Sequence, residues 1–327
     1  MVLLILIVAV ALLFDYTNGF HDTANSIATS VSTRALSPRA AVIMAAGLNL
    51  LGALISTSVA KTVGSGLVNT DLVTLPLVLA ALIGAVIWNF TTWYFGIPSS
   101  SSHALFGGLI GAMIAAAGVS GVLWGGVIEK IILPMVLSPL LGLVVACFLM
   151  TGLTWLVRKR PPSPVNRTFR ILQPISAGFM AFSHGANDAQ KTMGIIALAL
   201  FASGQIDTFE IPLWVKILCA LTMAAGTYSG GWRIIHTLGS KVIKLDPIHG
   251  FAAETSAASV IQLATHCGIP VSTTHVITSS IMGVGATQRL SAVRWGVARS
   301  IVFAWVVTLP AAGLVGAVAY LILNIFF

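Results

Sequence analysis

The stretch IPSSSSHALFGGLIG at residues 97–111 recurs as IPVSTTHVITSSIMG at residues 269–283. Both copies begin with Ile-Pro, continue through a cluster of hydroxyl side chains to a histidine at the same spacing, and then become apolar. Such a match between the two halves of one chain indicates an internal repeat. We therefore expect a fold of two related halves.

The composition around this repeat is that of a membrane protein. Of the 327 residues, 57% are hydrophobic and 8% are charged, which is more apolar surface than a soluble core of this size can bury. Apolar windows of about 20 residues predict membrane-spanning helices. They predict ten crossings, near residues 1–33, 38–58, 73–95, 98–118, 131–157, 170–201, 211–229, 249–268, 270–287 and 300–324. The first run leads directly into DYTNGFHDTAN, so we expect it to remain in the mature fold.

The basic residues lie in the joints between these runs. The net charge of +8 therefore reports membrane topology and not nucleic-acid binding. The positive-inside rule places both termini outside the cytoplasm in the inner (plasma) membrane, with the basic linker at 158–170 inside. Because each half then has five crossings, the second half must run upside down. We expect a first transmembrane repeat at 1–157 and an inverted one at 171–327.

The predicted fold class is an all-α polytopic membrane protein, an inverted repeat of about 5+5 transmembrane segments. The first and sixth crossings hold the polar segments DYTNGFHDTAN and FSHGANDAQKT, and we expect them to be broken helices. Pro98 and Pro270 should end any preceding helix, and the hydroxyl residues should cap a new half-helix near the midplane.

A helix that starts inside the membrane offers free amides and the positive end of its dipole to an anion. Inversion would make two such starts face each other, which predicts an anion site at the repeat interface. For either copy taken alone, the alternative is that the Pro-hydroxyl segment only caps a helix at its boundary and binds no anion. The predicted anion-binding hydroxyl residues are Ser100, Ser101, Ser102, Ser272, Thr273 and Thr274.

A few ionisable residues lie within the apolar runs, namely Asp15, Asp22, Asp188, Lys191 and Glu254. Charge at membrane depth costs roughly 2.5–3.5 kcal/mol per residue, so a polar pathway is indicated. Asp22 aligns with Asp188 in the second half, and either carboxylate can accept the proton of hydrogen phosphate but would repel sulfate. Alternatively, both bind a coupling ion or proton, together with Asn25, Asn187 and Glu254, or they only form structural hydrogen bonds.

The histidines and cysteines lead to weaker interpretations. His21, His103, His184 and His275 line the site or anchor its turns; a Ser-His hydrolase is disfavoured because no oriented acid accompanies them. The remaining candidates are Cys147, Cys219 and Cys267, which stand singly and without zinc-ligand spacing. We therefore expect no enzyme activity, no cofactor and no metal ligand among these residues.

The motifs GFHDTANSIAT at 19–29 and FSHGANDAQKTMG at 182–194, with the paired Pro-hydroxyl-His elements, resemble the inorganic phosphate transporter (PiT) family. The resemblance covers nearly the whole chain and is greatest to bacterial low-affinity members. It implies a symporter that carries phosphate with a coupling cation. Position by position, Asp22 and Asn25 match the first family motif, and Asn187 and Asp188 match the second.

One departure from the family pattern concerns the coupling ion. Sodium-coupled members typically have Asn three residues beyond the Asp in both halves, whereas this chain has Asn25 in the first half and Lys191 in the second. An ammonium group only donates hydrogen bonds and cannot ligate sodium, so Lys191 predicts proton coupling. His21 replaces the usual Asn of the first motif, which also disfavours sodium coupling. By resemblance, members with these motifs take phosphate together with divalent metal. A sodium-coupled symporter, a sulfate permease, an anion channel and a homo-oligomer remain open alternatives.

Overall fold

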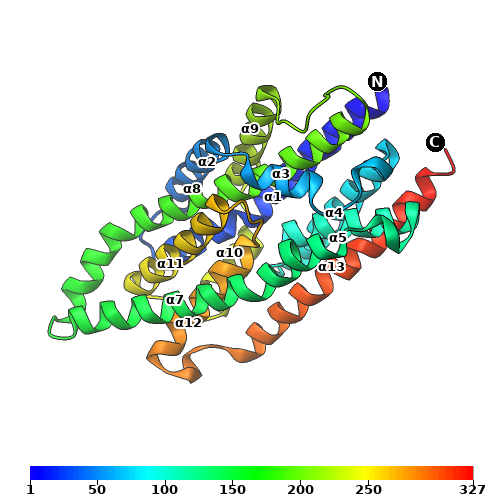
Figure 1. Ribbon diagram of the computed structural model, residues 1–327. Helices are drawn as coiled ribbons and strands as arrows, with labels where there is room; N and C mark the ends of the chain where they lie inside the picture. Colours follow the sequence, from blue (N-terminus) through cyan, green and yellow to red (C-terminus); the bar gives the residue numbers. More distant parts are fainter. Residues whose placement is uncertain (327) are drawn as a thin grey trace.

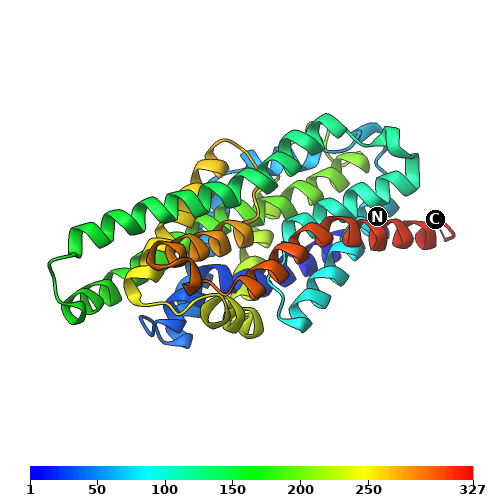
Figure 2. The ribbon, with the colours of Figure 1, turned by 90° about the horizontal axis from the view of Figure 1, so that it is seen from below.

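The computed structural model describes residues 1–326, which form long helices packed side by side (Figures 1 and 2). The first half contains α1 (Val2–Ser32), α2 (Pro38–Ile55), α3 (Ser58–Ser65), α4 (Leu75–Phe95), α5 (Ser101–Ala117), α6 (Trp124–Val127) and α7 (Leu133–Val157). The second half contains α8 (Pro162–Ala202), α9 (Leu213–Ser229), α10 (Trp232–His236), α11 (Pro247–His266), α12 (Thr273–Gln288) and α13 (Trp295–Leu323). No β-strand occurs in the described part of the chain, so the predicted all-α class is confirmed.

Each predicted crossing corresponds to one helix. Five helices are long and apolar enough to span a membrane, namely α1, α2, α4, the continuous α6–α7 segment and α13; α5 and α9 are shorter apolar helices. Helices α8, α11 and α12 are more polar or shorter than these five spanning helices. Their polar side chains are largely buried against other helices, which explains how they can lie inside an apolar bundle.

One expectation about these elements is wrong. Helices α1 and α8 are not broken, because both run continuously through their polar segments. Several of their buried polar side chains bond residues of other helices, as His21 bonds Thr92 on α4 and Thr192 bonds Asp15, so the backbone does not have to open to supply polar groups. The basic linker predicted at 158–170 is helical from Pro162 onward, which leaves only 158–161 between α7 and α8.

The order of elements repeats along the chain. Each half has a long helix, an apolar helix of 18 or 17 residues, a short helix, two further helices joined through Ile-Pro, and another long helix. The two termini lie at one end of the bundle, and the connection from α7 to α8 lies at the other (Figure 1). Helix α8 therefore runs opposite to α1.

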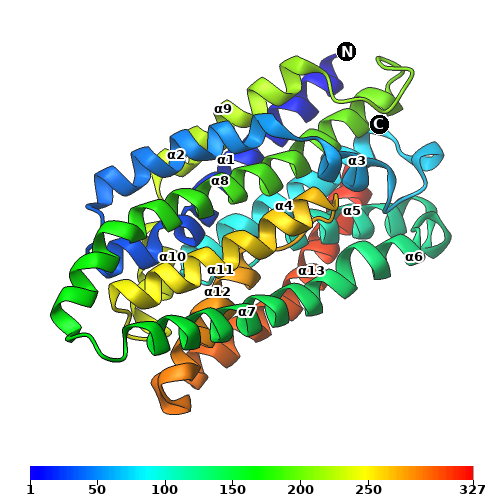
Figure 3. The same cartoon turned by 60° about the vertical axis from the view of Figure 1, so that its left-hand side comes forward.

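Equivalent glycines bring the long helices close to their neighbours. Helix α1 packs on α9, and α8 packs on α2 and also contacts α11 (Figure 3). A Cβ atom on Gly19 would lie 2.5 Å from the carbonyl oxygen of Met223, and one on Gly185 would lie 2.2 Å from that of Asn49. Small residues permit this close backbone approach in membrane helices. The same crossing is thus built twice.

The Ile-Pro segments have the same local structure in both halves. Gly96 and Gly268 end α4 and α11 with positive φ angles of 64° and 68°, a conformation that glycine adopts without a steric penalty. After the proline, the Ser100 hydroxyl accepts a hydrogen bond from the His103 amide, and the Ser272 hydroxyl accepts one from the His275 amide. Helices α5 and α12 therefore begin inside the protein, each with an N-cap.

Two apolar cores lie on either side of a polar layer. In α1 the first core includes Leu4–Phe14 and the second includes Ala24–Ala28. In α8 the order is reversed, since Met180 belongs to the second core and Met193 to the first. The polar segments of both helices fall between the cores, and there they meet the starts of α5 and α12.

Candidate functional site

The polar layer gathers the motif residues of α1 and α8 in one place. Asp22 and Asn25 come from α1, and Asp188 and Lys191 come from α8; all four are 0–2% exposed. Each pair is three residues apart on one helix, so both side chains face the same direction. The structure thus brings together two pairs of residues that lie 166 positions apart in the sequence.

Both helix starts contribute hydroxyl groups to this layer in equivalent ways. Within each half, Ser101 donates to Asp22 at 3.5 Å and Thr273 donates to Asp188 at 3.0 Å. Across the halves, Asn25 donates to the Thr274 hydroxyl at 2.9 Å, and the equivalent contact is from Lys191 to Ser102 at 2.5 Å. The hydroxyls of Ser100 and Ser272, also predicted to bind the anion, accept the cap hydrogen bonds of the His103 and His275 amides.

Lys191 joins the two halves through its ammonium group. The Nζ atom donates to Asp188 Oδ1 at 2.5 Å, to Ser102 Oγ at 2.5 Å and to the carbonyl oxygen of Val271 at 2.7 Å. These three acceptors use all three donors of an ammonium group. A fully buried lysine is therefore accommodated by one ion pair and two hydrogen bonds.

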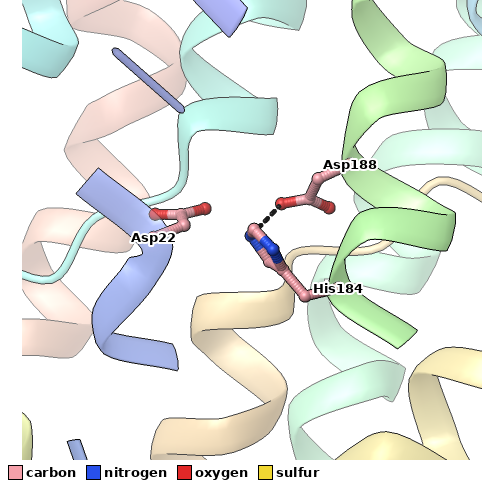
Figure 4. A group of neighbouring side chains, drawn as sticks. All are labelled: Asp22, His184 and Asp188. Carbon is pink, nitrogen blue, oxygen red and sulfur yellow. Dashed lines mark ion pairs between the residues drawn. The ribbon is translucent and has the colours of Figure 1, made fainter. Parts of the chain in front are cut away.

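Two carboxylates and an imidazole form a cluster at the centre (Figure 4). Asp22, His184 and Asp188 each direct one polar atom to a place where all three atoms lie within 4.8 Å of one another. His184 Nε2 lies 3.3 Å from Asp188 Oδ2. Carboxylate oxygens and imidazole nitrogen are metal ligands. The sequence predicts no metal ligand, whereas this geometry could hold an ion.

The neighbours of His21 and His184 orient the cluster. His21 Nδ1 lies 2.7 Å from Asp22 Oδ1, and its Nε2 lies 3.1 Å from Thr92 Oγ1 on α4. His184 Nδ1 lies 2.9 Å from Asn49 Oδ1 on α2. Thr92 and Asn49 carry no sequence signal, because isolated polar residues in apolar helices resemble ordinary packing contacts.

His103 and His275 lie behind the helix starts. Their ring centroids are 4.7 Å apart, and the His275 ring stacks on Trp305 at 4.0 Å.

Asn187 bonds Thr265 at 2.8 Å and the carbonyl oxygen of Ile269 at 3.4 Å. These contacts hold the Ile-Pro segment in place, so the role seen for Asn187 is positioning.

Glu254 lies apart from the cluster, in a cage of hydroxyl and amide donors. Its Oε1 accepts from Thr29, from Ser30 at 2.6 Å and from Gln173 at 3.2 Å, and its Oε2 accepts from Ser176. Thr29 follows Asp22 by seven residues on α1, which is about 10 Å along the helix axis. Glu254 therefore forms a second polar centre, on the side of the α7–α8 connection.

A buried polar centre between two apolar cores, inside a bundle of membrane-length helices, defines a multi-pass membrane transporter. Residues 18–316 match the family model described as "Phosphate transporter family". The chain therefore belongs to the phosphate transporter family, as its motifs predict.

Two bacterial relatives that carry the same name match nearly the whole chain. A protein of Rhizobium meliloti (strain 1021) is 51% identical over 97% of this chain and 96% of its own length, and one of Bacillus subtilis (strain 168) is 47% identical over 100% and 99%. Both are named "Probable low-affinity inorganic phosphate transporter". A solved structure titled "The sodium-dependent phosphate transporter" matches with a TM-score of 0.91 at 26% identity, over 100% of both chains. The relatives are thus transporters, which agrees with the predicted functional class.

Proposed function

We propose that this protein imports inorganic phosphate by proton symport, through alternating access about the site formed by α1, α5, α8 and α12. The observation that carries the proposal is the pair of capped helix starts that meet at Asp22, Asp188 and Lys191. The first amides of each helix have no partner within the helix and favour an anion. The family membership supports phosphate as that anion over sulfate.

The charges at the site favour symport. Asp22, Asp188 and Lys191 together carry one net negative charge when all are ionised. A phosphate anion would increase that charge in a buried, low-dielectric place, which is unfavourable without accompanying positive charge. Protons carried with the phosphate remove this penalty. A protonated phosphate can also donate a hydrogen bond to either carboxylate.

Lys191 favours protons over sodium. Its ammonium group lies between Asp188 and Ser102, where a cation would otherwise bind those oxygens. Since its equivalent in the first half is Asn25, this chain has a fixed positive charge at one of two equivalent positions. Glu254, with its four donors, is the second candidate for a proton-carrying group.

Alternating access requires specific bonds to open. Asn25 and Lys191 now bond the hydroxyl groups of the opposite half, so phosphate has to displace them to reach both helix starts. We assign 1–157 and 171–327 as the two inverted repeats, and the central bonds cross between them. With the basic joints in the cytoplasm, both termini lie outside it.

The test is uptake of labelled phosphate by proteoliposomes under separately imposed proton and sodium gradients. A proton gradient should drive accumulation in the wild type. Asp22→Asn and Asp188→Asn should each lower uptake about 10- to 100-fold, because each removes a charged hydrogen-bond acceptor. Asp71→Asn, the same change on an exposed residue before α4, is the matched control.

Three outcomes would count against the proposal. Wild-type uptake in either buried variant would remove these carboxylates from the site. Accumulation that needs sodium at fixed pH would contradict the role given to Lys191. Equal competition by excess sulfate would restore the sulfate alternative.

A metal–phosphate complex is the second candidate cargo, supported by the cluster of Asp22, His184 and Asp188. In this reading the three side chains contact the metal ion of the cargo. Uptake should then rise when Mg²⁺ is added to wild-type vesicles, and His184→Gln should lose that stimulation. Identical uptake with and without divalent ions would reject this cargo.

A further inference from the structure

Asp15 is a buried carboxyl group that the proposed mechanism does not use. It is 0% exposed on α1, and its Oδ1 accepts a hydrogen bond from Thr192 Oγ1 at 2.8 Å. Its Oδ2 is also buried and has no hydrogen-bond partner among the described residues 1–326. One oxygen of this carboxyl is therefore free to bind a proton.

Asp15 belongs to a polar stripe that continues to the central site. The residues of the stripe recur at alternating spacings of three and four along α1, which places them on one face of the helix. They are Asp15, Asn18, Asp22, Asn25 and Thr29. Asn18, between the two carboxyl groups, is 1% exposed, and neither atom of its amide has a partner within the described chain. The stripe thus joins Asp15 to Asp22 through a second unpartnered polar side chain.

The hydrogen bond of Asp15 connects it to the helix that carries Lys191. Its donor, Thr192, directly follows Lys191 on α8. The titratable group that acts electrostatically on Asp15 is Asp188 on α8. Helix α9 carries Cys219 and the half-buried Lys216, and helix α4, also packed on α1, contains no acidic, basic, His or Cys residue. Among the described residues no cation forms an ion pair with Asp15, whereas Lys191 forms one with Asp188.

An ionised carboxylate in this environment would be strongly unfavourable, whereas a protonated one is tolerated. Asp15 precedes Asp22 by seven positions, about 10 Å along the helix, and lies toward the end of the bundle that holds the chain termini. In the topology proposed above, that direction is extracytoplasmic. Asp15 and Glu254 thus lie on opposite sides of the centre.

We propose that Asp15 is a proton-binding residue on the extracytoplasmic side of the site, where it takes up the coupling proton before the proton reaches Asp22. This inference rests on the proposed proton symport. The step is proton binding alone: Oδ2 accepts a proton from extracytoplasmic water, and the same proton later leaves toward Asn18 and Asp22. Thr192 is the positioning residue that holds Oδ1.

The experiment compares two activities in the same proteoliposomes, using labelled inorganic phosphate. One is accumulation driven by a proton gradient, and the other is exchange of labelled for unlabelled phosphate at equal pH. Asp15→Asn should lower the ratio of accumulation to exchange by about tenfold or more, because the amide cannot carry the proton. Asp15→Glu, which keeps the carboxyl, should stay within about threefold of the wild type. Tyr16→Phe is the control on the neighbouring residue. It removes the 2.6 Å bond from Tyr16 to Ser229 on α9 but no carboxyl group.

The outcomes separate this inference from the proposed function. A wild type that does not respond to a proton gradient refutes proton symport itself. A responsive wild type with an unchanged ratio in Asp15→Asn refutes the role of Asp15 alone. Loss of both activities in Asp15→Asn would assign Asp15 a structural role and would likewise overturn the proposal.

Discussion

Lys191 and Asn25 occupy equivalent positions but make different bonds. Asn25 donates to Thr273 and Thr274, whereas Lys191 also forms an ion pair with Asp188. The two halves of the site are therefore similar in shape and unequal in charge. A buried lysine of this kind is retained only where its partners satisfy it fully.

Removing the Lys191 charge should destabilise the protein, and removing its partner as well should restore much of the loss. Lys191→Met leaves the buried Asp188 carboxylate without its lysine partner, and breaking a buried ion pair in this way costs about 3–5 kcal/mol. In Lys191→Met/Asp188→Asn neither charge remains, so the free energy of unfolding should recover. Denaturation of the purified variants in one detergent measures both effects.

Lys159→Met, on an exposed lysine before α8, provides the control for loss of a positive charge. A Lys191→Met variant as stable as the wild type would show that the ion pair is not coupled to folding. No recovery in the double variant would mean that Lys191 stabilises the protein through Ser102 and Val271 instead.

At the scale of elements, α1 and α8 combine two roles that the sequence suggested were incompatible. Each is a long continuous helix, and each presents a buried polar face to the centre. Close crossings make this possible, because they bring hydroxyl and amide partners within reach of several of these side chains. Helix α1 obtains partners from α4, α8 and α12.

Widening one of these crossings should weaken the fold. A Cβ atom on Gly185 would lie 2.2 Å from the carbonyl oxygen of Asn49, so Gly185→Ala must push α8 away from α2. Overpacking of this kind typically costs about 1–3 kcal/mol. Thermal unfolding in detergent should show a lower midpoint temperature.

Gly47→Ala is the control on α2, because a Cβ atom there meets no atom within 4 Å. Its midpoint temperature should equal that of the wild type or exceed it slightly, since alanine favours helix. Equal midpoints for the variants at Gly185 and Gly47 would contradict the close crossing.

At the scale of the whole molecule, the two termini share one end of the bundle and the α7–α8 connection lies at the other (Figure 1). The basic residues Arg158, Lys159 and Arg160 lie at that second end. In the proposed topology, the positive-inside rule places this second end in the cytoplasm. The Asp15 side of the site would then face the extracytoplasmic space.

Labelling of natural and introduced cysteines tests the orientation. Cys267 is exposed at the end of α11, whereas Cys219 is buried and Cys147 is half-buried. A membrane-impermeant thiol reagent added to intact cells should label the wild type, and Cys267→Ser should lose most of that label. Lys159→Cys in the Cys267→Ser background should react only in inside-out vesicles. The opposite pattern would invert the proposed topology.

Most of the helices and many of the site residues are predictable from local sequence. Apolar run length reflects bilayer thickness, and the duplicated Ile-Pro-hydroxyl-His segment shows where α5 and α12 begin. The continuity of α1 and α8 was not predictable, because it depends on partners that are distant in sequence. Thr92, for example, is 71 positions from His21, with which it bonds.

The residue types, the repeat and the polar content of α1 and α8 follow from the sequence, because hydropathy, helix caps and motif spacing are properties of neighbouring residues. The packing decides which of those residues meet. It brings Lys191 into contact with Ser102 and Asp188, and it makes the Ser100 and Ser272 hydroxyls helix caps. It also places His184 beside Asp22 and Asp188 and keeps Glu254 apart from them. Such contacts arise from how helices cross, and a one-dimensional pattern does not encode crossing geometry.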